Sequence, residues 1–205
     1  MERTHVRGGS IEVITGSMFS GKTEELIRRL RRGLFAKQNV QAFKPRIDNR
    51  YSESDVMSHN QSKIQAEVID FPEMIYEKLH SNTEVVGVDE AQFFSPTIVQ
   101  VCMNLADQGL RVIVAGLDTD YRGRPFGSMP ELMTVAEFVT KQHAICMSCG
   151  SLASKTQRIV ANAHDILVGS GEFYEARCRL CFEPPIIQNP LQSTENKVKE
   201  STWNV

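Results

Sequence analysis

Short apolar runs alternate with amphipathic segments along most of the chain. Residues 11–15 include the apolar Ile11, Val13 and Ile14, and residues 111–117 form the most continuous apolar run. Runs of this length are typical of strands buried on both faces, whereas apolar residues three or four positions apart are typical of helices. Further strands are predicted over 40–44, 67–69 and 84–88, and helices over about 24–36, 71–79, 96–109 and 129–142.

This alternation predicts an α/β fold with a mostly parallel sheet and helices on both faces. We expect it to fill residues 1–142, because the composition changes only where the cysteines begin. With 205 residues, 41% of them hydrophobic, the chain is long enough for one good core and one small appendage. We expect the appendage over 143–190 and a polar, disordered tail over 191–205.

The charge pattern limits the classes of partner. The formal net charge of -2 gives no overall field toward nucleic acid or an anionic membrane, so we expect neither as a partner. The segment 28–32 carries four arginines on one predicted helix, which favours a solvated face or a subunit contact over a nucleic-acid site. No apolar run is long enough to cross a bilayer, and the N-terminal residues lack a signal sequence, so we expect a soluble, cytoplasmic protein.

The stretch between the first strand and the first helix predicts a phosphate-binding loop. Glycines at both ends permit a tight turn whose backbone N–H groups converge on a phosphate at the positive end of a helix. A lysine that reaches the phosphates and a hydroxyl for Mg²⁺ complete the pattern of an ATP-type site. The stretch consists of Gly16, Ser17, Met18, Phe19, Ser20, Gly21, Lys22 and Thr23.

Two acidic residues follow the strand predicted over 84–88. Asp89 at the carboxyl end of a buried strand is positioned to hold Mg²⁺ or its water beside a phosphate loop, with Glu90 next to it. The alternative is a strand end capped by two ordinary surface acids, which the upstream phosphate loop makes the weaker interpretation.

Four of the five cysteines form two C-x-x-C pairs: Cys146 with Cys149, and Cys178 with Cys181. Four thiolates in two pairs suit a tetrahedral Zn²⁺, and with no open coordination position the metal is structural. A redox pair is the alternative. The stretch between the pairs is predicted to form a hairpin whose tip or returning arm is rich in glycine and ends at Tyr174. Its glycines either let the backbone approach a ligand, which Tyr174 would cover, or belong to a simply flexible hairpin.

Several segments together resemble one family, the type II thymidine kinases of bacteria and animal cytosol. They are Gly-Ser-Met-Phe-Ser-Gly-Lys-Thr, Phe-Lys-Pro with Asp-Asn-Arg-Tyr-Ser, Asp-Glu-Ala-Gln-Phe-Phe, Val-Ala-Gly-Leu-Asp with Arg-Pro-Phe-Gly, and Cys-Arg-Leu-Cys. The resemblance implies a homotetramer that moves the γ-phosphate of ATP to the 5′-hydroxyl of thymidine or deoxyuridine in nucleotide salvage. It also implies feedback inhibition by dTTP.

The same resemblance assigns residues. Glu90 is the expected general base, Asp48 and Arg50 lie near the phosphates, and Asp89 and Gln92 line the same floor. The resemblance also implies that a glycine-bearing substrate loop, the lasso, closes the thymine pocket. This loop belongs to the zinc-binding appendage. The expected pocket residues are Met18, Leu117, Tyr121, Phe126, Ile166, Leu167, Val168, Gly169 and Tyr174, with Tyr121 standing where many relatives have phenylalanine.

Two other classes of function fit the residues. A zinc-stabilised ATPase or switch that acts on nucleic acid would use Glu90 to activate water. A nucleotide-binding module without catalysis would not need Glu90 for its function. An Asp-Glu pair after the strand permits each of these, so the acceptor of the phosphoryl group is the point that decides between them.

Overall fold

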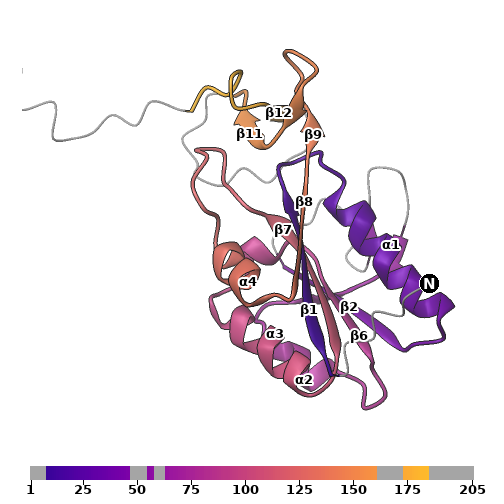
Figure 1. The fold of residues 1–205 in the computed structure, drawn as a ribbon. Coiled ribbons are helices and arrows are strands. Elements are labelled where there is room, and N and C mark those ends of the chain that lie inside the picture. Colours follow the sequence, from indigo (N-terminus) through magenta and orange to yellow (C-terminus); the bar gives the residue numbers. More distant parts are fainter. Residues whose placement is uncertain (1–7, 47–54, 58–62, 161–172, 185–205) are drawn as a thin grey trace, which may run out of the picture.

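A six-stranded parallel sheet forms the centre of the molecule (Figure 1). The computed structural model describes residues 8–46, 55–57, 63–160 and 173–184. The strand order is β5-β2-β6-β7-β1-β8, which confirms the α/β prediction and the interior position of the most continuous apolar run. The strands are β1 (Ser10–Gly16), β2 (Val40–Pro45), β5 (Glu67–Ile69), β6 (Val85–Val88), β7 (Arg111–Leu117) and β8 (Phe138–Gln142).

Helices cover both faces of this sheet because successive strand residues point to opposite sides. Val112 and Val114 of β7 pack in the core shared with α3, whereas Ile113 packs in the core shared with α1. Within the described ranges, no helix is both long enough and apolar enough to cross a membrane. The helices are α1 (Lys22–Phe35) on one face, and α2 (Met74–Lys78), α3 (Thr97–Asp107) and α4 (Met129–Val135) on the other, with a short 3-10 turn, η1 (Ala91–Phe93), after β6.

The second half of the helix predicted over 129–142 is wrong. Helix α4 ends at Val135, and the chain then forms β8, which pairs with β1 so that Val139 lies beside Val13. The strand lies at the edge of the sheet, and Phe138 and Val139 are 44% and 47% exposed. An edge strand lacks the continuous apolar run of a buried strand, so its residues continued the helical spacing of α4 in the sequence.

A small lobe follows β8 and lies beyond the carboxyl end of that strand (Figure 1). Its two antiparallel sheets are formed by β9 (Ala144–Ile145) with β10 (Leu152–Ala153), and by β11 (Lys155–Arg158) with β12 (Tyr174–Arg177). The last pairing confirms the predicted hairpin, whose connection over 161–172 lies outside the described residues. A further hairpin, β3 (Asp55–Met57) with β4 (Lys63–Gln65), was not predicted.

A partly buried cluster of charges joins α1 to the sheet. Glu12 of β1 accepts from Arg29 of α1 at 2.8 Å and from Arg111 of β7 at 2.6 Å. Arg29 also donates to Thr140 of the edge strand at 2.9 Å. One carboxylate therefore connects a helix and two strands, and its own side chain is only 12% exposed.

We predict that Glu12→Gln lowers the free energy of unfolding by about 1–3 kcal/mol, because two partly buried guanidinium groups lose their ionic partner. Denaturant titration measures this change. Asp70→Asn is the matched control, because the Asp70 ion pair with Arg46 is exposed and its loss shifts the unfolding free energy by no more than about 0.5 kcal/mol. Equal effects of the two substitutions would contradict the prediction.

Candidate functional site

The phosphate loop connects β1 to α1, as predicted. Gly16 has a φ of 144°, and a Cβ there would lie 2.3 Å from the backbone oxygen of Gln142 in β8. Gly21 has a φ of 81° and immediately precedes α1. The loop therefore requires glycine at both positions, and it ends at the positive terminus of a helix of 14 residues.

Lys22 folds back over this loop. Its Nζ donates to the backbone oxygen of Ser17 at 2.7 Å, and the Ser20 hydroxyl donates to the same oxygen at 2.8 Å. Burial lowers the pKa of Lys22, while the nearby charges of Glu90 and Asp89 act in the opposite direction. The ammonium group of Lys22 thus lies near the carboxylates of Glu90 and Asp89 and against the phosphate loop. From this position it can also contact an anionic phosphate bound in the loop.

Asp89 lies at the carboxyl end of β6 and faces the loop. The Thr23 hydroxyl donates to Asp89 Oδ2 at 3.3 Å, and the backbone N–H of Glu90 donates to Oδ1 at 3.0 Å. Burial, together with the charge of Glu90, raises the pKa of Asp89 to about 7. A hydroxyl facing a carboxylate is the donor set with which phosphate-loop enzymes hold Mg²⁺, so these two residues fit that ion.

Glu90 stands at a sharp turn between β6 and the 3-10 turn η1. Its backbone has φ 51° and ψ 40°, a left-handed conformation that is uncommon for a residue other than glycine. Gln92 donates through Nε2 to Glu90 Oε2 at 2.5 Å and accepts from the backbone N–H of Leu117 at 3.0 Å. These hydrogen bonds join three of the predicted site residues in one connected group.

The loop over 118–127 borders the same end of the sheet. Asp118 forms an ion pair with Lys141 of β8 at 2.6 Å, and its side chain is buried. The ring of Phe126 meets that of Phe93 edge to face at 5.4 Å. Tyr121 has the guanidinium groups of Arg122 and Arg158 at 4.8 Å and 4.9 Å from its ring centroid. An aromatic surface with adjacent positive charge therefore flanks the acidic floor.

The small lobe contacts the phosphate loop directly. The backbone N–H of Met18 donates to the Thr156 hydroxyl of β11 at 3.0 Å, and the Ser17 hydroxyl lies 3.5 Å from the backbone oxygen of Ala153. Arg158, whose guanidinium lies over Tyr121, is paired in register with Tyr174 of β12. The lobe therefore connects the predicted phosphate side of the site with the predicted nucleoside side.

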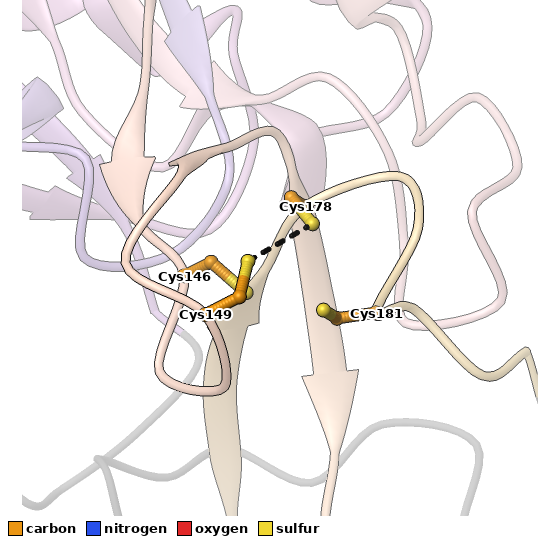
Figure 2. Close-up of side chains that lie close together, drawn as sticks. All are labelled: Cys146, Cys149, Cys178 and Cys181. Atoms are coloured by element: carbon orange, nitrogen blue, oxygen red, sulfur yellow. Dashed lines mark hydrogen bonds between the residues drawn. The ribbon is translucent and has the colours of Figure 1, made fainter.

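The four predicted metal ligands converge at the end of the lobe (Figure 2). Their Sγ atoms all lie within 4.8 Å of one another, and Cys149 Sγ is 3.6 Å from Cys178 Sγ. Zn–S bonds of about 2.3 Å in a tetrahedron require sulfur atoms about 3.8 Å apart, so the cluster fits Zn²⁺. The lobe's own core consists of three alanines and two of these cysteines, too little apolar volume to hold four short strands without a metal.

Several predicted site residues lie outside the described ranges. These are Asp48, Arg50 and the lasso residues Ile166, Leu167, Val168 and Gly169. The described site also contains residues that sequence reasoning did not assign to it. Asp118 carried the same signal as Asp89, an acid directly after a buried strand. No comparable local signal marked Phe93, Thr156 or Arg158, which reach the site through tertiary packing.

Comparisons with known proteins agree on one family. The family model described as thymidine kinase matches residues 9–182. The chain is 56% identical over 182 residues to a thymidine kinase of Bdellovibrio bacteriovorus, an alignment that covers 89% of each chain. It is 55% identical over 177 residues to a thymidine kinase of Rhodothermus sp., covering 86% of this chain and 83% of the relative.

We predict about one Zn²⁺ per chain by elemental analysis of protein purified under reducing conditions without chelators. Cys178→Ser removes one of four ligands and should lower the metal content below about half an equivalent, with a lower melting temperature. Cys102→Ala is the matched control, because Cys102 is buried in α3 away from the cluster. Less than half an equivalent in the unaltered protein would refute the metal site.

We predict that Asp89 makes the ligand-free protein less stable as the pH rises. The unfolded carboxyl titrates near pH 4, about three units below the folded one, so the folded state retains a proton that the unfolded state loses. The stability from this group is complete below about pH 4 and is lost as the pH rises through about 7.

Asp89→Asn cannot titrate at this position and is the reference protein, with Lys22 and Glu90 present in both proteins. Between pH 5 and pH 8, the unfolding free energy of the unaltered protein should fall relative to that of the variant by more than about 1 kcal/mol. Denaturant titration without Mg²⁺ or nucleotide measures the difference. A difference that does not change with pH would contradict the prediction.

Proposed function

Because this chain belongs to the thymidine kinase family, we propose that it transfers the γ-phosphate of ATP to the 5′-hydroxyl of thymidine or deoxyuridine in nucleotide salvage. The single observation that best supports this reaction is the grouping of Thr23, Asp89 and Glu90. A phosphate loop faces a buried carboxylate, and a second carboxylate follows it directly at the surface of the same floor.

Glu90 is the proposed general base. It takes the proton of the 5′-hydroxyl as that oxygen bonds to the γ-phosphorus, while the bond from the γ-phosphorus to the bridging oxygen breaks and ADP leaves. The side chain is exposed, whereas Asp89 beside it is buried and receives a hydrogen bond from Thr23. This difference supports separate roles, with Asp89 on the metal side and Glu90 on the acceptor side.

Charge neutralisation supplies most of the proposed catalysis, because phosphoryl transfer passes through a loose transition state. Lys22 exchanges the Ser17 oxygen, 2.7 Å from Nζ, for the oxygens of the β- and γ-phosphates. Thr23 and Asp89 are the residues that would hold Mg²⁺, which offsets phosphate charge when it is bound. Asp48 and Arg50 are proposed to act near the same phosphates.

The acceptor base is proposed to lie between the small lobe and the end of β7. Tyr121 and Phe126 offer aromatic surfaces, and Leu117 ends the central strand. Met18 lies in the phosphate loop, which the lobe contacts through Thr156, and Tyr174 lies in β12 of the lobe, paired with Arg158. The lasso over 166–169 is proposed to close this pocket, and the Tyr121 hydroxyl is available for a hydrogen bond that a phenylalanine would lack.

Three further features rest on the family resemblance. We propose a homotetramer, feedback inhibition by dTTP, and a division of the chain into a nucleotide-binding domain (1–142), a zinc-binding and substrate-lasso domain (143–190) and a tail (191–205). Size-exclusion chromatography with light scattering tests the tetramer. Titration of the activity with dTTP tests the inhibition.

The acceptor is tested by ADP release from ATP in the presence and absence of thymidine. A thymidine kinase releases ADP in proportion to thymidine phosphate formed, with little release from ATP alone. Release that ignores thymidine but rises with DNA or RNA would reject the proposed function in favour of a nucleic-acid-dependent ATPase.

We predict that Glu90→Gln lowers kcat by about 10²- to 10⁴-fold, because the amide cannot accept the proton. ATP binding, measured with a fluorescent nucleotide, should stay within about threefold of the unaltered protein, since the phosphate loop is intact. Glu131→Gln, on the exposed side of α4, is the matched control and should keep full activity. Near-normal turnover of Glu90→Gln would reject Glu90 as the base.

A further inference from the structure

We propose that Gln92 is a positioning residue that orients the carboxylate of Glu90 toward the acceptor hydroxyl. This role rests on the proposed kinase function and adds a residue to its machinery. The Gln92 side chain hydrogen bonds with Glu90 and with the backbone of Leu117. It acts through Glu90, and its anchor is the end of the central strand β7.

The hydrogen bonds determine which way the Gln92 amide faces. The backbone N–H of Leu117 can only donate, so the atom 3.0 Å from it must be the amide oxygen, Oε1. The amide nitrogen, Nε2, then faces Glu90 Oε2 at 2.5 Å and donates to it. The main chain of β7 thereby sets the direction of a hydrogen bond to the proposed base.

Close packing holds the Gln92 side chain in this place. The residue is only 3% exposed. A Cβ on Gly116 would lie 2.8 Å from Gln92 Oε1, and a Cβ on Gly127 would lie 2.2 Å from the Gln92 backbone oxygen. The adjacent Phe93 ring meets Phe126 edge to face. Gln92 is thus a fixed support in a tight space between β7 and the loop over 118–127.

The backbone of Glu90 is constrained in the same region. Its left-handed conformation costs free energy on the order of a few RT, because Glu90 is not glycine. In this conformation the Glu90 backbone N–H donates a hydrogen bond to Asp89 Oδ1. The backbone sets where the side chain begins, but the rotamers of a glutamate still offer several directions. The contact with Gln92 selects one of them.

The selected direction has a chemical consequence. Oε2 accepts the hydrogen bond from Gln92, which lowers its basicity relative to Oε1, so we assign the proton of the acceptor hydroxyl to Oε1. A general base works only within hydrogen-bond reach of the proton it abstracts, and a displacement of about 1 Å can cost about a hundredfold in rate. Orientation by Gln92 should therefore affect turnover much more than nucleotide binding.

The test uses Gln92→Glu and Gln92→Leu in the full chain. Gln92→Glu keeps an acceptor for the Leu117 N–H but replaces the donor to Glu90 with a carboxylate, and Gln92→Leu removes both groups. We expect kcat to fall by about tenfold or more in each, with the KM for ATP within about threefold of the unaltered enzyme. The control Gln100→Glu makes the same chemical change on the exposed face of α3 and should leave kcat unchanged.

The pH profile of kcat separates positioning from a merely structural role. In Gln92→Glu, two carboxylates in contact share one proton, so the acid limb of the profile should move to higher pH by about one unit or more. Asp89 and Lys22, the other charged groups beside Glu90, are unchanged in all these proteins. Loss of stability alone would lower activity without moving this limb.

The outcomes are distinguishable. If the unaltered enzyme releases no thymidine-dependent ADP, the proposed function fails. If the unaltered enzyme does release ADP in the presence of thymidine, and both Gln92 variants keep kcat within about twofold, only the role of Gln92 fails. The role also fails if kcat falls together with the melting temperature while the acid limb stays in place. A crystal structure of Gln92→Leu with Glu90 in its original direction would overturn it independently of activity.

Discussion

The parallel pairing of β1, β7 and β6 is the constraint on which the rest of the site depends. Parallel strands end at the same edge of a sheet, so the phosphate loop after β1, Asp118 after β7 and Asp89 after β6 share one region. Burial there raises the pKa of Asp89 and lowers that of Lys22. Such an arrangement of charges suits a ligand that brings both phosphate and a divalent cation.

The small lobe is a second wall of this site, held together by its cysteines. Thr156 accepts a hydrogen bond from the backbone of the phosphate loop, and Arg158 lies over Tyr121. Because the core of the lobe is formed largely by alanines, the cysteine cluster is the feature able to keep these contacts in register. A metal held by the four cysteines would thereby support the contacts of the lobe with both sides of the proposed site.

The floor between these walls is organised by main-chain groups as much as by side chains. The backbone N–H of Leu117 donates a hydrogen bond that orients Gln92, and the backbone N–H of Glu90 donates a hydrogen bond to Asp89. Main-chain donors are fixed by the sheet and the turn, so the acids they support keep their directions without an energetic cost at the moment of reaction. The uncommon backbone of Glu90 is a local cost of this arrangement.

The sequence by itself determined the features that local spacing encodes. The phosphate loop, the Asp89-Glu90 pair, the four cysteines and most buried strands are contiguous patterns, and their backbone requirements, such as the positive φ of Gly21, are local. Tertiary structure decided β8, which needed a partner in β1 to become a strand, and the link from Gln92 to Leu117. It also joined Met18 to Thr156, 138 residues away in the chain. Such contacts arise when packed layers bring distant donors and acceptors together, and no local pattern encodes that meeting.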